Sequence, residues 1–205
     1  MMLKYLRSKE FATLYLVFLS LTTLVAWVNA NPPKAEQFAS VSVLGPSKTA
    51  TQYFPNNSSQ IKTGEVINWY IQVYNHMESA ELFFLNIKIG NQSLTDTPNA
   101  PTNTPSAGFT ILQSYQVVLN NDTWIVPLQW WVVNNTINGN SVVIGALQVN
   151  TSTAPAIGIS AVFGKNFRII IELWSYDVQL HEFLFSFRSG GVVYSLWNQQ
   201  WFDLT

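Results

Sequence analysis

The segment EVINWYIQVY, Glu65–Tyr74, decides the fold class of this chain. Its side chains alternate between an apolar set and a polar or aromatic set: Ile67, Trp69, Ile71 and Val73 against Asn68, Tyr70, Gln72 and Tyr74. Successive side chains of a β-strand point to opposite faces of the sheet, so this alternation predicts a half-buried strand. Its outer face is expected to be aromatic and polar.

The same period-two pattern recurs along the chain. Residues Ala80–Ile89 alternate in the same way, and the short connection at 75–79 predicts that the two strands form a hairpin. Further strands are predicted at Ala39–Leu44, Phe109–Leu119, Thr123–Val133, Ser141–Asn150, Phe167–Tyr176 and once or twice within Glu182–Trp197. No helical period is evident after residue 30, so residues 38–205 are predicted to form an all-β, immunoglobulin-like β-sandwich.

Two segments interrupt this pattern. Asn91–Gly108 is rich in Pro, Thr and Asn, which predicts a long surface loop that is either functional or a tolerated insertion. Residues 29–37 contain Pro32 and Pro33 and predict a short, stiff stalk ahead of the domain.

An apolar run, Phe11–Val28, follows Lys4, Arg7 and Lys9, and the next cation is Lys34. A helix over residues 11–28 is roughly 27 Å long, close to the hydrocarbon core of a bilayer at about 30 Å. The positive-inside rule places residues 1–10 in the cytoplasm and the bulk of the chain outside. We therefore expect a single-pass signal anchor held by membrane lipid, with an extracellular or pseudoperiplasmic domain.

Two alternatives for this run stay open. Val28-Asn29-Ala30 carries short side chains where signal peptidase cleaves, although the run exceeds the usual signal core of about 7 to 15 residues. The run also fits the assembly helix of a pilin-like filament subunit, although residues 6–10 lack the Gly or Ala expected of a processing motif.

Composition excludes several classes of function. Charged residues make up 10% of the chain and the formal net charge is -1, so the basic footprint of a nucleic-acid-binding protein is missing. Cysteine is absent, which excludes disulfides, thiol chemistry and Cys-ligated copper sites. No phosphate-binding glycine loop, nucleophile elbow or His pair at metal-ligand spacing is found, so neither a cofactor nor an enzymatic activity is expected.

Few side chains are candidates for metal binding or catalysis. The only histidines, His76 and His181, lie near Glu78, Glu81, Asp177 and Glu182, and a metal-dependent enzyme is the alternative if the two connections meet in space. Glu172 shares a strand face with Ile170 and Trp174 inside an apolar run. Arg168 or Arg188 is expected to be its ion-pair partner, which is a structural role.

The commonest local motif is Asn-X-Ser/Thr, at Asn56, Asn57, Asn91, Asn121, Asn134 and Asn150. Most of these residues lie in predicted turns, so surface N-glycosylation is predicted. The alternative is that Asn, Ser and Thr are simply common turn residues.

Six aromatic residues are candidates for binding: Tyr70, Tyr74, Trp130, Trp131, Trp197 and Trp201. Trp130 and Trp131 are adjacent in a predicted strand, so one of them points away from the side on which the other packs. Exposed aromatic side chains suit other membrane or cell-surface proteins, or glycans. Core filling is the alternative for most of the tryptophans.

Several short segments follow one another in a recognisable order: Val43-Leu44-Gly45-Pro46, Tyr53-Phe54-Pro55, Gly64-Glu65, Val73–His76, Leu119–Trp124, Pro127-Leu128 and Arg168–Trp174. Over roughly residues 41–196 this series resembles the exported domain of the archaeal DUF1616 family of membrane proteins. The resemblance implies an archaeal, membrane-associated protein with an immunoglobulin-like domain outside the cytoplasm, and it implies no reaction. Family members with several spans differ from this chain, which argues against a transport role.

The sequence therefore predicts an envelope protein that acts by binding, as an accessory or structural subunit of a membrane complex or cell-surface assembly. A glycan-binding surface module is the second hypothesis.

Overall fold

The computed structural model describes residues 9–32, 36–94, 104–189 and 191–205. The chain divides into two compact units, Met1–Glu36 and Gln37–Thr205. Parts of the segments predicted at 1–10, 29–37 and 91–108 lie outside the described residues.

The first unit contains the helix α2 (Lys9–Ala30). Residues 11–30 form an apolar span of 20 residues, long and apolar enough to cross a membrane. Its Ser and Thr hydroxyls all donate to carbonyls three or four residues earlier, from Thr13, Ser20, Thr22 and Thr23. These bonds satisfy the hydroxyls within the helix, as an apolar environment requires. The predicted apolar helix is confirmed, and both a membrane anchor and a signal sequence have these properties.

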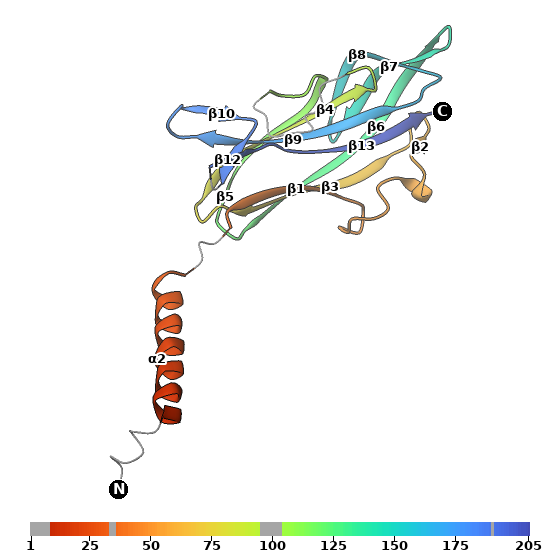
Figure 1. The fold of residues 1–205 in the computed structure, drawn as a ribbon. Coiled ribbons are helices and arrows are strands. Elements are labelled where there is room, and N and C mark those ends of the chain that lie inside the picture. The colour runs from red at the N-terminus through yellow and green to blue at the C-terminus, as the bar shows by residue number, and fades with distance from the viewer. Residues whose placement is uncertain (1–8, 33–35, 95–103, 190) are drawn as a thin grey trace. The chain divides into compact units, whose positions relative to one another are not determined.

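The second unit is a β-sandwich (Figure 1). Its elements are β1 (Phe38–Leu44), the 3-10 turn η1 (Pro55–Asn57), β2 (Gln60–Ile61), β3 (Ile67–His76), β4 (Glu81–Asn91), β5 (Phe109–Val118), β6 (Thr123–Asn138), β7 (Ser141–Val149), β8 (Ser152–Val162), β9 (Phe167–Asp177), β10 (Glu182–Leu184), β11 (Phe187–Ser189), β12 (Val192–Tyr194) and β13 (Leu196–Leu204). The first sheet has the order β1-β3-β6-β7-β8. The second has the order β2-β13-β9-β4-β5, with β10 paired to β9, and β11 pairs with β12.

The predicted all-β sandwich with one N-terminal apolar helix is confirmed, but the predicted hairpin within residues 65–89 is wrong. β3 pairs with β1 and β6, whereas β4 pairs with β5 and β9 in the other sheet. The connection explains the difference, because the buried side-chain amide of Asn75 donates to the carbonyls of Ser79 and Val118, each at 2.8 Å. These bonds fix a turn that carries the chain from one sheet to the other.

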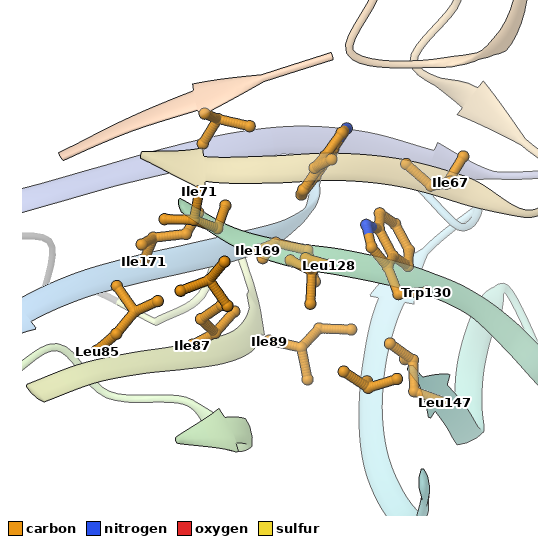
Figure 2. Close-up of a cluster of buried hydrophobic side chains, with 14 of the residues drawn as sticks. Ile67, Ile71, Leu85, Ile87, Ile89, Leu128, Trp130, Leu147, Ile169 and Ile171 are labelled. Atoms are coloured by element: carbon orange, nitrogen blue, oxygen red, sulfur yellow. The ribbon is translucent and has the colours of Figure 1, made fainter. Parts of the chain in front are cut away.

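The core lies between the two sheets (Figure 2). Apolar side chains enter it from the first sheet and from the second: Ile67, Ile71, Leu128, Trp130 and Leu147, and Leu85, Ile87, Ile89, Ile169 and Ile171. The Trp130 ring lies 5.3 Å from the ring of Trp69 and 5.1 Å from that of Phe202. A chain without cysteine is thus held together by aromatic and branched aliphatic packing.

Candidate functional site

The two sheets differ in what covers their outer faces. On the second sheet, Phe183 of β10 packs on Phe84 of β4 with 5.5 Å between ring centroids, and Phe185 packs on Trp174 of β9 at 5.3 Å. Ser106 also lies on this face and is only 4% exposed. Segments of the same chain that contain Phe183, Phe185 and Ser106 therefore cover the outer face of β4 and β9. Within the predicted surface loop, Ser106 is therefore buried, while Thr104, Pro105 and Gly108 are exposed.

A buried ion pair lies under this cover. Lys88 Nζ is 3.0 Å from Glu172 Oε2, and the two side chains are 8% and 0% exposed. Glu172 also accepts hydrogen bonds from the backbone N–H and the hydroxyl of Ser106, from Asn86 Nδ2 and from Trp174 Nε1. A buried carboxylate needs both a counter-charge and filled hydrogen-bonding positions, and Glu172 has both. This arrangement gives Glu172 a structural role.

The ion-pair partner of Glu172 is Lys88, not the predicted Arg168. Asn86 is directly opposite Glu172 in the β4–β9 pair, so Lys88 is its diagonal neighbour on the same face. Arg168 instead donates to the carbonyl of Leu94 and lies over the ring of Trp201. The side chain of Arg188 is outside the described residues.

The outer face of the first sheet is exposed or half-buried along β3 and β6. The side chains that form it are Asn68, Tyr70, Gln72 and Tyr74 from β3, and Thr123, Ile125, Pro127, Gln129 and Trp131 from β6. Tyr70 is opposite Pro127 and Gln72 is opposite Ile125 in the register, so these residues form a continuous surface. We call this surface the open face.

The first sheet is also free of charge. None of its strands, β1, β3, β6, β7 and β8, contains Asp, Glu, Lys or Arg. The charged strand residues lie in the other sheets, at Glu81, Lys88, Arg168, Glu172, Asp177, Glu182, Arg188 and Asp203. Charged residues are depleted and aromatic residues enriched in the buried centre of protein interfaces. The open face has that composition.

Groups at the two ends of β3 pack against the tyrosines of the open face. Lys48 Nζ lies 5.0 Å above the ring of Tyr70. At the other end, the ring of Tyr74 stacks with His76 at 6.2 Å and lies 5.8 Å from Phe38. Both tyrosine rings are therefore supported by neighbours rather than projecting freely.

The six predicted binding aromatics are divided among three places. Tyr70, Tyr74 and Trp131 belong to the open face. Trp130 is fully buried, because the alternation of β6 points it inward with Leu128 and Val132, so it is not a binding residue. Trp197 and Trp201 alternate with core residues on β13 of the second sheet, and Trp201 is 37% exposed. The structure therefore does not bring the six together.

The two histidines do not form a metal centre with the neighbouring carboxylates. His76 is half-buried and its Nδ1 contacts Asn121 Oδ1, while His181 is exposed. Across the part of the chain that the structure describes, no three His, Cys, Asp or Glu side chains are grouped so that they could hold a metal ion. The metal-dependent alternative therefore has no supporting site in that part.

The six glycosylation motifs differ in accessibility. Asn56, Asn57, Asn121 and Asn134 are exposed. Asn91 donates from Nδ2 to the carbonyl of Ser160, and Asn150 donates from Nδ2 to the carbonyl of Pro127. Asn150 Oδ1 also accepts from the backbone N–H of Gln129, so both polar atoms of this side chain hold the β7–β8 turn in place.

Comparison with solved structures gives a distant likeness. The crystal structure of the C-terminal domain of wzt is similar with a TM-score of 0.32 and 7% sequence identity, over 84% of this chain and 80% of that chain. Neither a family model nor a curated protein matches the sequence. The resemblance to the DUF1616 family therefore stays a prediction.

Proposed function

We propose that this protein is a single-pass membrane protein whose exported β-sandwich binds a partner protein through the open face. In this role it is an accessory or structural subunit of a membrane complex or cell-surface assembly, and it carries out no reaction of its own.

One observation carries the proposal: the chain itself covers the outer face of β4 and β9, while the outer face of β3 and β6 is open and these two strands contain no Asp, Glu, Lys or Arg. An exposed sheet gains solubility from charged side chains, and edge strands are commonly protected by them. The strands of the first sheet have no charged side chains that would increase solubility or protect the edge strands β1 and β8. A partner surface that buries Ile125 and Trp131 would gain apolar contact without removing a charged strand residue from water.

The helix supports the membrane part of the proposal. The apolar span of 20 residues matches the thickness of a bilayer core, and its Ser and Thr hydroxyls are satisfied internally. Basic residues precede the span and none lies within it, which favours a cytoplasmic N-terminus and an exported domain.

Native electrophoresis of solubilised membranes tests the proposal. Membranes that contain the full-length chain are dissolved in a mild detergent, and the proteins that migrate with it are identified by mass spectrometry. We expect a band of high mass that Ile125→Arg removes, because Ile125 is 41% exposed on the open face. Val117→Arg is the matched control, since Val117 is 54% exposed on β5 of the second sheet.

Two results would contradict the proposal. One is migration of the unmodified chain as a monomer in gentle detergent. The other is a complex that both arginine variants weaken equally, because that would place the contact elsewhere than on the open face.

A further inference from the structure

The loop between β1 and β2 forms a cleft of about 390 Å³ beside the start of β3. This volume lies within the range of about 300–1,000 Å³ that is usual for small-ligand sites. The cleft adjoins the open face, since Asn68 of β3 belongs to both.

The loop is fixed to the core, so the cleft exists before any ligand binds. The indole N–H of Trp69 donates to the carbonyl of Tyr53, and the ring of Phe54 packs edge-on against Trp69 at 5.6 Å. At the start of the loop, Gly45 accepts from the N–H of Lys48 and donates to the carbonyl of Thr49. A side chain at Gly45 would collide with the backbone of Thr51, which shows how closely the loop is folded.

Four non-glycine residues of this loop have a left-handed backbone: Lys48 at φ 59°, Gln52 at 56°, Asn56 at 55° and Asn57 at 54°. Such conformations are uncommon outside glycine and tend to gather at functional sites. Three of the four, Gln52, Asn56 and Asn57, line the cleft. The strained backbone therefore directs amide side chains to the cleft wall.

The polar part of the lining consists of amides. Gln52, Asn56, Asn57 and Asn68 each carry a carbonyl acceptor and an NH2 donor, and all four are exposed. None of the nine lining residues is Asp, Glu, Lys, Arg or His. An amide can donate to one hydroxyl and accept from another, whereas phosphate, carboxylate or metal ligands call for charged partners.

The apolar part of the lining consists of rings and one valine. Tyr53, Phe54 and Pro55 are half-buried in the wall, and Pro46 and Val66 complete it. Flat apolar surfaces next to paired donors and acceptors match a ring that has C–H groups on its faces and hydroxyls around its edge. We propose that this cleft binds a neutral carbohydrate. This site goes beyond the proposed function and does not depend on it, and it uses none of the tryptophans that the sequence indicated for sugars.

A glycan array tests the assignment. The full-length protein is produced in a host without N-glycosylation, so that Asn56 and Asn57 carry no sugar of their own, and is reconstituted in lipid nanodiscs because sugar-headed detergents would compete. The array carries neutral and acidic glycans. We expect binding to neutral glycans, confirmed by calorimetric titration of the best one.

Two variants and one control locate the binding. Val66→Arg places a long cation in the cleft, and Gln52→Gly removes an amide while allowing the left-handed backbone. Each substitution should raise the Kd for the glycan roughly tenfold or more. Gln52→Gly removes one hydrogen-bonding amide, and Val66→Arg prevents the ring from fitting into the cleft. Val178→Arg is the control, since Val178 is exposed after the far end of β9. It should bind like the unmodified protein.

Three results of these binding experiments would contradict the carbohydrate site. Absence of glycan binding, binding restricted to acidic glycans, or unchanged binding by Val66→Arg would each overturn the assignment. Native electrophoresis of the same variants reports on partner binding, whereas the glycan array reports on the cleft. The two proposals can therefore fail independently of each other.

Discussion

Lys88 and Glu172 form an ion pair of 3.0 Å between neighbouring strands of the second sheet, with both side chains withdrawn from solvent. Removing one member of a buried pair leaves the other charge uncompensated, which is usually far worse than losing both. The pair also connects the sheet to the segment above it, because Lys88 Nζ donates to the carbonyl of Ser106 at 2.6 Å.

Lys88→Met should lower the free energy of unfolding by about 3–5 kcal/mol, because it leaves the carboxylate of Glu172 buried without a cation. Adding Glu172→Gln to that variant should recover part of the loss, since the amide needs no counter-charge. Chemical denaturation of the three proteins in the same detergent measures both effects. Lys62→Met, at an exposed lysine, should change stability by less than about 0.5 kcal/mol.

Substitution of the two neighbouring tryptophans of β6 by alanine should lower the stability by very different amounts. Trp130→Ala empties a fully buried site and should cost about 3–5 kcal/mol of stability. Trp131→Ala should cost about 1 kcal/mol or less, because this side chain belongs to the open face. Thermal unfolding followed by circular dichroism compares the two. Equal losses would show that the inward and outward assignment within β6 is wrong.

Glycan occupancy should follow the hydrogen bonds of the asparagine side chains. In a host that glycosylates exported proteins, sugar is expected on Asn121 and on Asn134. Asn91 and Asn150 should stay unmodified, since their amide nitrogens donate to strand carbonyls. Glycopeptide mass spectrometry reads each site. Occupied Asn150 in the folded protein would contradict the structure of the β7–β8 turn.

The helix α2 should hold the chain in the membrane. The full-length protein is expected to remain with the membrane pellet after washing in alkaline carbonate, whereas a variant without residues 1–30 should be released. Peptide coverage of residues 11–30 in the mature protein decides between an anchor and a signal peptide. A soluble mature chain that begins at Asn31 would show that the helix is removed.

The period-two pattern predicts β4, β7 and β9 well, because each places apolar side chains in the same core. It does not predict which strands pair. The separation of β3 from β4 depends on the buried hydrogen bonds of Asn75 to residues as far along the chain as Val118. Strand β8 escapes prediction because residues 152–162 are rich in Ser, Ala, Pro and Gly.

The candidate site is only partly visible in the sequence. Alternation places Tyr70 and Tyr74 on an outer face, but adjacency alone does not say which of Trp130 and Trp131 points outward. Lys88 and Glu172 lie 84 residues apart, so their pairing depends on the register of β4 and β9. The charge-free character of the first sheet becomes apparent only when its five strands are known to lie together.

The most direct test of partner binding through the open face is site-specific photo-crosslinking in intact cells. A photoreactive amino acid replaces Ile125 on the open face or, as the control, Val117 on the second sheet, both of which are exposed. We predict a discrete crosslinked product of higher mass from position 125 and none from position 117. Crosslinks from position 117 alone, or from neither position, would contradict the claim that the open face binds a partner.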